Sequence, residues 1–216
     1  MAVALVNSRK GNAASSLATN WSVTAGNILV AFFFSDNPSE PTLGCSDGTN
    51  SYTQLAHVTK WGAHANIYVC SLAAGGTITV TANATWDAIV LAEFSGATLT
   101  TDATTVATGL DNIYTQTLAI VAPSDGDLIL SCWSVGSPAV TYSGSIGTDF
   151  QKYHNGSTLL CIANWATGAA STFTQVFTLS PTWASANGGG IIAALKAAAA
   201  GTVVPVFMNP YRHRRN

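Results

Sequence analysis

The segment AGNILVAFFFSDNPS, residues 25–39, is the clearest indication of the fold class, because it places an unbroken apolar run between a Gly-Asn turn and a Ser/Pro loop. A short run with these boundaries predicts a core strand. The segment DGDLILSCWSVGSPA, residues 125–139, repeats the plan: a Gly-polar turn, an apolar run and a Ser/Pro loop. We therefore expect one architecture that occurs twice in the chain.

Further runs rich in β-branched and aromatic residues recur along the chain, each about six to ten residues long and bounded by turn residues. This pattern is typical of an all-β sandwich. The expected strands occupy residues 27–34, 65–72, 77–82, 88–94, 115–122, 127–135, 157–166 and 173–179. The Ala-rich segment IIAALKAAAAG has high helix propensity, but the three glycines before it favour a final strand, with a short terminal helix as the alternative.

A second echo joins residues 65–97 to residues 157–198, where Trp86 and Trp183 each precede a final strand. Each half, about residues 1–98 and 99–200, supplies about four or five strands and would leave a hydrophobic face open on its own. We therefore expect one domain over residues 1–200, a single β-sandwich of two antiparallel sheets built from two echoing halves. Residues 96–114 are expected to cross from one half to the other.

The composition indicates a neutral surface. Charged residues make up 8% of the chain, against about 25% in a typical globular domain. A surface with so little charge repulsion favours association with neighbouring molecules, although hydroxyl and amide groups could instead keep a monomer in solution. Three of the eight basic residues lie in the last five positions, so the body carries a net charge of −5 and the tail +3.

The tail, GTVVPVFMNPYRHRRN at residues 201–216, predicts an extended arm, since its two prolines exclude a continuous helix or a central strand. An arm that is first apolar and then basic suits attachment to a neighbouring subunit. A frayed, solvated end is the alternative. Nucleic acid is not an expected partner, since no basic patch lies behind the tail. The expected assembly residues are Val206, Phe207, Tyr211, Arg212, Arg214 and Arg215.

The N-terminal stretch MAVALVNSRKGNAA has its basic pair after a short apolar run, which is the reverse of a signal peptide. No segment has the length of apolar sequence that a membrane span needs.

The four cysteines, Cys45, Cys70, Cys132 and Cys161, form no CxxC pair, and the last three lie in apolar runs. We therefore expect buried thiols and synthesis in a reducing cytoplasm.

No motif predicts catalysis, and we expect no enzyme activity, metal or cofactor. The oxygen-rich stretch SDGTNSY, residues 46–52, resembles a calcium loop but lacks the EF-hand spacing, and a hairpin turn explains it better. Residues 123–128 are expected to turn into a strand. The histidines lack helical zinc spacing; His57 and His64 could meet across a hairpin, without a third ligand. The two glutamates, Glu40 and Glu93, are not marked as a catalytic pair.

One group of aromatic residues could bind a sugar ring. Trp61 lies in a loop-like stretch, and Tyr52 and Tyr153 could lie near it, which would make a platform for a glycan. The alternative is that Trp61 closes one end of the sandwich. The other tryptophans lie in or beside expected strands and are predicted to be core residues: Trp21, Trp86, Trp133, Trp165 and Trp183.

Five stretches in order, TAGNILVAFFF, DGTNSYTQL, GGTITVTANATWDAIVLAEFSGA, PSDGDLILSCWSV and GGGIIAALKAA, resemble a jelly-roll-like β-sandwich domain of bacterial surface proteins and phage structural proteins. The resemblance spans about residues 2–198, and its motifs are turns and strand ends rather than catalytic groups. It implies a jelly-roll-like fold.

The bacterial domains usually sit in long exported chains, whereas we expect no signal, partner domain or sorting segment for this chain. The resemblance therefore implies a virion component, either a capsid decoration protein or a tail appendage, made in the host cytoplasm. Its expected partners are copies of itself and other virion proteins. The alternative is a carbohydrate-binding or host-adhesion module that contacts a host surface glycan.

Overall fold

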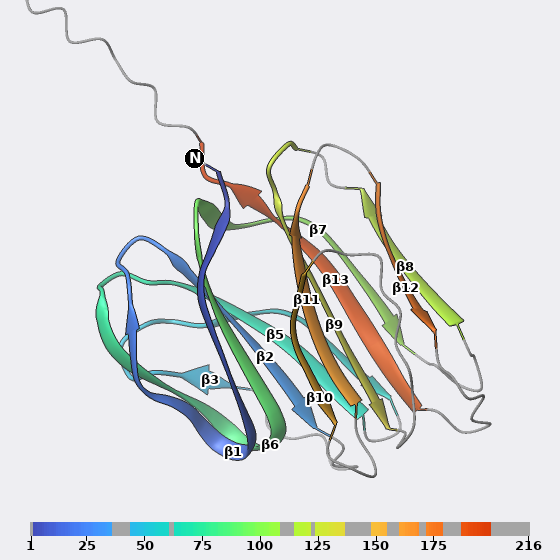
Figure 1. The fold of residues 1–216 in the computed structure, drawn as a ribbon, viewed down its shortest axis with the longest axis horizontal. Coiled ribbons are helices and arrows are strands. Elements are labelled where there is room, and N and C mark those ends of the chain that lie inside the picture. The colour runs from blue at the N-terminus through green and yellow to red at the C-terminus, as the bar shows by residue number, and fades with distance from the viewer. Residues whose placement is uncertain are drawn as a thin grey trace, which may run out of the picture.

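The computed structural model describes residues 2–35, 44–60, 63–108, 115–121, 124–136, 148–154, 160–168, 172–178 and 187–199. These residues form thirteen strands, all paired antiparallel, in three sheets, and contain no helix. The expectation of an all-β antiparallel sandwich is confirmed (Figure 1).

The first sheet has the order β1-β6-β2-β5-β4, with the short strand β3 paired to β6. Its strands are β1 (Ala4–Val23), β2 (Ile28–Ser35), β3 (Cys45–Ser46), β4 (Thr53–Lys60), β5 (Ala63–Ser71) and β6 (Gly76–Ser95). The second sheet has the order β10-β11-β9-β13-β7. Its strands are β7 (Ala97–Thr108), β9 (Leu128–Gly136), β10 (Thr148–His154), β11 (Leu160–Thr167) and β13 (Asn187–Ala197). A two-stranded sheet joins β8 (Thr115–Val121) to β12 (Thr172–Thr178).

Strand β2 is buried along its whole length because both of its faces meet apolar layers. Alternate side chains, including Phe32 and Phe34, enter the core between the two large sheets together with Leu130 and Cys132 of β9. The intervening side chains, including Phe33, enter a second core on the outer face of the first sheet. Burial of each large apolar side chain contributes about 1.5–3 kcal/mol, so this strand is central to stability.

The second core is closed by β1 and β6, which are 20 residues long and bend over the first sheet (Figure 1). Their register shifts between Ala14 and Ser16, at the bend. Beyond it, Trp21 of β1 and Val80 of β6 are buried in the outer core. Residues 77–82 and 88–94, expected as separate strands, are therefore two parts of one bent strand.

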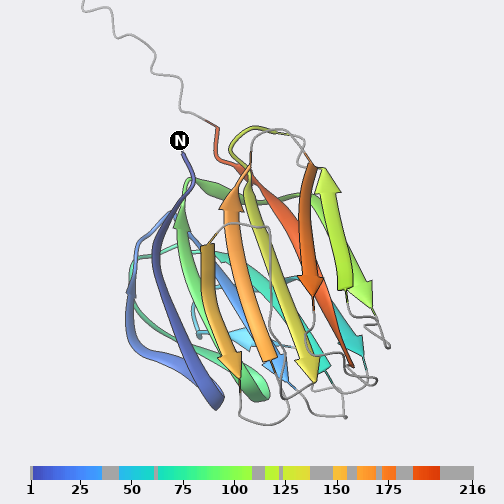
Figure 2. The same ribbon diagram turned by 45° about the vertical axis from the view of Figure 1, so that its right-hand side comes forward.

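Strands β8 and β12 cover the second sheet on the side away from the first, as both ribbon views show at the right (Figures 1 and 2). Leu118 and Ile120 of β8 are buried there. Phe173 of β12 lies so close to Gly168 that a Cβ at position 168 would come within 2.8 Å of its ring. The molecule thus has four layers: the bent part of β1 and β6, the two large sheets, and the β8–β12 pair.

The two halves of the chain follow the same strand plan. The order β1-β6-β2-β5-β4 corresponds, position by position, to β7-β13-β9-β11-β10. The outer parts of β1 and β6 correspond to β8 and β12, since each pair covers the outer face of its sheet. The structure therefore reproduces the duplication expected from the two sequence echoes.

The turns before β2 and β9 are also equivalent. Each contains a glycine with positive φ, 84° at Gly26 and 86° at Gly126, a conformation that glycine adopts without steric cost. Each turn exchanges two backbone hydrogen bonds with one residue of a neighbouring strand's end: Leu72, directly after β5, in the first half, and Gly168, directly after β11, in the second. These bonds are Gly26 N to Leu72 O, Leu72 N to Asn27 O, Gly126 N to Gly168 O and Gly168 N to Asp127 O.

The structure corrects the expectation for one segment and decides between the two alternatives for another. Residues 97–108, expected within the crossing segment, form β7 at the end of the second sheet. The Ala-rich segment forms strand β13, as favoured, because its small residues pack between β7 and β9. The likeness to a jelly roll stays a prediction.

Candidate functional site

The stretch 46–52 is a turn built around the carboxylate of Asp47. This carboxylate accepts hydrogen bonds from the backbone N–H groups of Thr49 (2.8 Å) and Asn50 (2.7 Å), from Asn50 Nδ2 (2.7 Å) and from the hydroxyl of Tyr52 (3.0 Å). Partial burial acts to raise the pKa of Asp47, but the bonds from Asn50, Thr49 and Tyr52 outweigh it and lower that pKa. The carboxylate thus holds the turn through local donors.

The same turn is not the expected hairpin. Strand β3 before it pairs with β6, and strand β4 after it pairs with β5, so the turn connects two strands that belong to different pairs. The hairpin was expected from the turn residues alone, and these do not show which strands pair on either side of the turn. The partners of β3 and β4 come from residues 63–82, which the turn itself does not determine.

The expected glycan platform is only partly within the described residues. Tyr52 is half-buried, donates its hydroxyl to Asp47 and packs against the outer core of the first sheet. The backbone of Tyr153 lies in β10, an end strand of the second sheet, while its side chain and the whole of Trp61 lie outside the described part. The described residues therefore do not bring these aromatic rings together, and the platform stays a prediction.

The expected assembly arm also lies outside the described residues, which end at Ala199. This applies to all of its named positions, which are Val206, Phe207, Tyr211, Arg212, Arg214 and Arg215. The arm stays a prediction.

The two histidines are not directly opposite each other. In the antiparallel register of β4 and β5, His57 lies opposite Asn66 and His64 lies opposite Thr59. His64 is buried, with its Nδ1 2.9 Å from the hydroxyl of Thr59, whereas His57 is exposed. The hairpin of β4 and β5 thus offsets the two histidines by two positions, a register that continues from the pair Lys60 and Ala63 next to the turn. Their contact stays a prediction.

Glu93 is a structural residue of the first half. It is buried in β6, and its Oε1 accepts hydrogen bonds from the backbone N–H of Thr24 (2.9 Å) and from Asn27 Nδ2 (2.6 Å). Both donors belong to the turn before β2. A buried carboxylate that accepts bonds from a turn stabilises that turn, so Glu93 fixes the entry into the central strand.

The described cysteines are free thiols. Cys70 and Cys132 are buried, as expected, and Cys45 is partly exposed. Burial raises the pKa of Cys70 to about 11, and it also raises the pKa of the Cys45 and Cys132 thiols well above their usual range. These thiols are poor nucleophiles, because the thiolate is the reactive form. The side chain of Cys161 is outside the described part.

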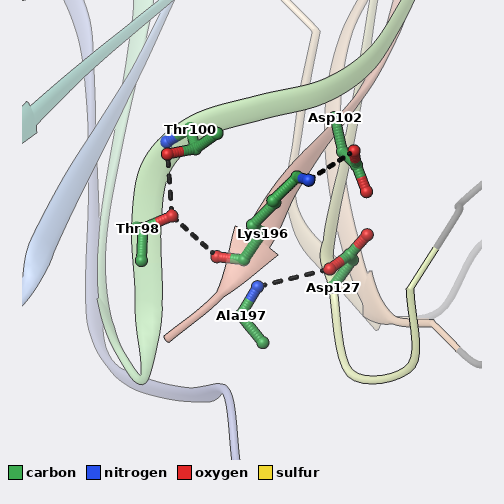
Figure 3. A network of polar contacts seen from close by, with 6 residues as sticks. All are labelled: Thr98, Thr100, Asp102, Asp127, Lys196 and Ala197. Atoms are coloured by element: carbon green, nitrogen blue, oxygen red, sulfur yellow. Dashed lines mark hydrogen bonds and ion pairs between the residues drawn. The ribbon is translucent and has the colours of Figure 1, made fainter. Parts of the chain in front are cut away.

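Three charged residues meet at one end of the second half (Figure 3). They come from different elements: Asp102 from β7, Asp127 from the turn before β9, and Lys196 from the end of β13. Lys196 Nζ lies 3.3 Å from Asp102 Oδ1, and Asp127 Oδ1 accepts a 3.3 Å bond from the backbone N–H of Ala197. We call Asp102, Asp127 and Lys196 the carboxylate cluster.

The carboxylate cluster is largely shielded from solvent. Asp127 is 0% exposed, and the side chain of Asp102 is 9% exposed against 46% for Lys196. Burial, followed by the contact with the Asp102 carboxyl group, raises the pKa of Asp127. Thr98 ties β7 to the same place by donating its hydroxyl to the carbonyl of Lys196 (3.1 Å).

A shallow pocket of about 340 Å³ opens beside this cluster. It is lined by the turn before β9 and the end of β13, namely Ser124, Asp125, Gly126, Asp127, Lys196, Ala197, Ala198 and Ala199. From the sequence, Asp127 was expected only as a turn residue, and Asp102 and Lys196 were not among the candidate site residues. One feature of the sequence could have indicated the site. In the match of residues 125–139 to residues 25–39, Asp127 stands at the position of the neutral Asn27.

Within the described residues, no group of three or more histidine, cysteine, aspartate or glutamate side chains is arranged to hold a metal ion. No helix in that part of the chain is long and apolar enough to cross a membrane.

In the comparisons with known proteins, no family model, no curated protein and no solved structure matches this chain.

Proposed function

We propose that this chain is a non-enzymatic structural protein of a virus particle, a capsid decoration protein or a tail appendage. In this proposal it assembles with copies of itself and with other virion proteins through its neutral surface and its C-terminal arm. The phage and virion assignment comes from the sequence resemblance. The assembly part is supported by the exposed edge of β7, whose exposed residues are uncharged.

The observation that carries the proposal is the unprotected edge of β7. This strand is the last in its sheet, and Leu99, Thr100, Thr101 and Thr104 on it are exposed. Its one charged residue, Asp102, is turned into the carboxylate cluster. Monomeric proteins usually protect such edges with exposed charges, prolines or short strands, because free N–H and C=O groups invite pairing with another chain.

The neighbouring edge extends this surface. Strand β4 ends the first sheet and packs against β7 and β13. Its exposed described residues are Thr53 and His57. Two sheet edges thus lie side by side. Such a side suits contact with a second protein that adds a strand to one or both sheets.

The charge distribution adds an attractive element. The body has a net charge of −5 and the tail +3. Opposite charges on two parts of the same chain favour the contact between the tail of one copy and the body of another, and this attraction weakens as salt screens it.

The first test compares the solution mass of the full chain with that of a chain ending at Gly201, by light scattering at matched concentrations and at low and high salt. We expect a defined oligomer for the full chain and a monomer for the shortened chain. Equal monomeric masses across the concentration series would overturn the assembly proposal.

A second test addresses the β7 edge. Thr101→Lys places a charge on the exposed edge and should lower the mass of the full chain. Thr79→Lys is the matched control, because Thr79 is exposed on the bent part of β6, away from β7. If the two variants assemble equally well, β7 is not the contact edge.

A further inference from the structure

We propose that Asp102 and Asp127 share a single proton, and that gain or loss of this proton controls how firmly β7, the turn before β9 and the end of β13 are held together. This goes beyond the assembly proposal and does not depend on it.

Each carboxyl group has one oxygen with a partner and one without. Asp102 Oδ1 faces Lys196 Nζ, and Asp127 Oδ1 accepts a bond from the N–H of Ala197. The remaining oxygens, Asp102 Oδ2 and Asp127 Oδ2, are buried and have no hydrogen-bond partner. Figure 3 shows these two oxygens pointing toward each other from β7 and from the turn.

Two carboxylates in this arrangement repel each other, since an ionised carboxylate is only an acceptor and both carry a negative charge. One proton taken from solvent resolves the conflict. It forms an O–H bond on one Oδ2 and donates a hydrogen bond to the other, so both buried oxygens gain a partner. A charge-assisted bond of this kind is shorter and stronger than a neutral one.

A metal ion fits the cluster less well than a proton does. Calcium takes six to eight oxygen ligands, whereas the described residues do not offer a third acidic, histidine or cysteine ligand here. The ammonium group of Lys196 already lies beside Asp102 and would repel a cation. The two Oδ2 atoms are closed to solvent, which a proton tolerates and a hydrated ion does not.

The charged groups around the pair indicate where the proton resides. Lys196 on β13 forms an ion pair with Asp102. Asp125, in the same turn as Asp127, is exposed and adds negative charge. Strands β8 and β12 contain no titratable residue. Asp127 is completely buried, and burial together with Asp102 raises its pKa. Asp127 is therefore the protonated partner.

The sign of the effect follows from this shift. A carboxyl group whose pKa is higher in the folded state than in the unfolded state stabilises the fold at low pH, and this contribution is lost as the pH rises through the folded-state pKa. The pH range over which stability is lost therefore begins just above the ordinary aspartate pKa of 3.8 and extends upward to the folded-state pKa of Asp127. Within it, the unfolding equilibrium constant rises roughly tenfold for each unit by which the pKa is raised.

The test is denaturant unfolding of the full chain between about pH 4 and pH 8, for the parent, for Asp127→Asn and for Asp125→Asn. The asparagine at position 127 keeps an oxygen for the Ala197 N–H, and its amide can donate to Asp102 at every pH. We expect Asp127→Asn to remove the loss of stability that the parent shows on raising the pH, with an unfolding constant at pH 8 equal to or smaller than that of the parent. Asp125→Asn, the matched control, should retain the loss.

A second measurement needs no variant. The side-chain carboxyl carbons of ¹³C-labelled aspartates report protonation directly in an NMR titration. We expect the carbons of residues 102 and 127 to respond together as one proton leaves the pair, with Asp127 titrating above an ordinary aspartate. The proposal is overturned if Asp127 titrates at the ordinary value, or if Asp127→Asn and Asp125→Asn show the same pH profile as the parent.

Discussion

The indole ring of Trp133 lies against Gly190, its cross-strand neighbour in the second sheet. The two residues are opposite each other in the register of β9 and β13, and a Cβ at position 190 would lie 2.6 Å from Cδ2 and Cζ3 of the ring. Because both residues are in central strands of a packed sheet, neither can move aside without disturbing its neighbours. The absence of a side chain at 190 therefore makes room for the largest side chain of β9.

Gly190→Ala should consequently destabilise the protein by about 1–3 kcal/mol, the usual cost of overpacking a core. Urea unfolding measures the change. The control is the double variant Gly190→Ala with Trp133→Leu, in which the smaller side chain leaves space for the new methyl group. The loss on adding the alanine should be smaller in the Trp133→Leu background, and equal losses in the two backgrounds would contradict the packing explanation.

Glu93→Ala should destabilise the turn before β2. The change removes the acceptor for Thr24 N–H and Asn27 Nδ2, and an unsatisfied donor in a buried site costs about 1–3 kcal/mol. Glu93→Gln keeps an oxygen at the same position and should lose less. The free energy of unfolding from urea titration distinguishes them, and an equal loss for both variants would show that the hydrogen bonds are not the cause.

Asp47→Ala should lower stability by about 1 kcal/mol at neutral pH, because the turn loses its common acceptor. The pKa of Asp47 is lowered in the folded state, so its contribution is present above the ordinary aspartate pKa and is lost as the pH falls through the folded-state value. The difference between parent and variant, followed by thermal unfolding, should therefore shrink at acid pH. A difference that is constant with pH would exclude the charged carboxylate as the cause.

Cys70 and Cys132 should react slowly with a thiol reagent in the native protein and quickly after unfolding. Both thiols are buried, and burial raises the pKa of each, so little thiolate is exposed to the reagent. Alkylation followed by peptide mass analysis assigns the rate to each cysteine. Fast labelling of Cys132 in the native state would show that the second sheet opens locally.

The strands that could be predicted from sequence are those with unbroken apolar runs, such as β2 and β9, where burial on both faces removes the need for alternation. Five strands were missed. One is the short β3, and the other four, β1, β4, β7 and β10, are the end strands of the two large sheets. Many of their residues are small or polar, and the sequence of these strands shows no strong period. The bend of β6 was missed for a related reason, since two apolar runs separated by polar residues look like two strands.

The carboxylate cluster shows the same limit for a site. Asp127 was visible in sequence as a turn residue, but its partner Asp102 lies in a segment expected to be a connection. Their meeting depends on the register of β13 with β7 and with β9, and register is a property of paired strands rather than of either strand alone.

Three properties could be predicted from the sequence: the chain is all-β, its halves repeat one plan, and it has few charged residues. Those properties follow from local patterns: apolar runs, turn residues and composition. The tertiary structure alone decided which strands pair, how β1 and β6 fold over the first sheet, and which carboxyl groups share a buried space. The physical reason is that antiparallel pairing and burial depend on contacts between residues far apart in the chain, whose free energy no local pattern contains.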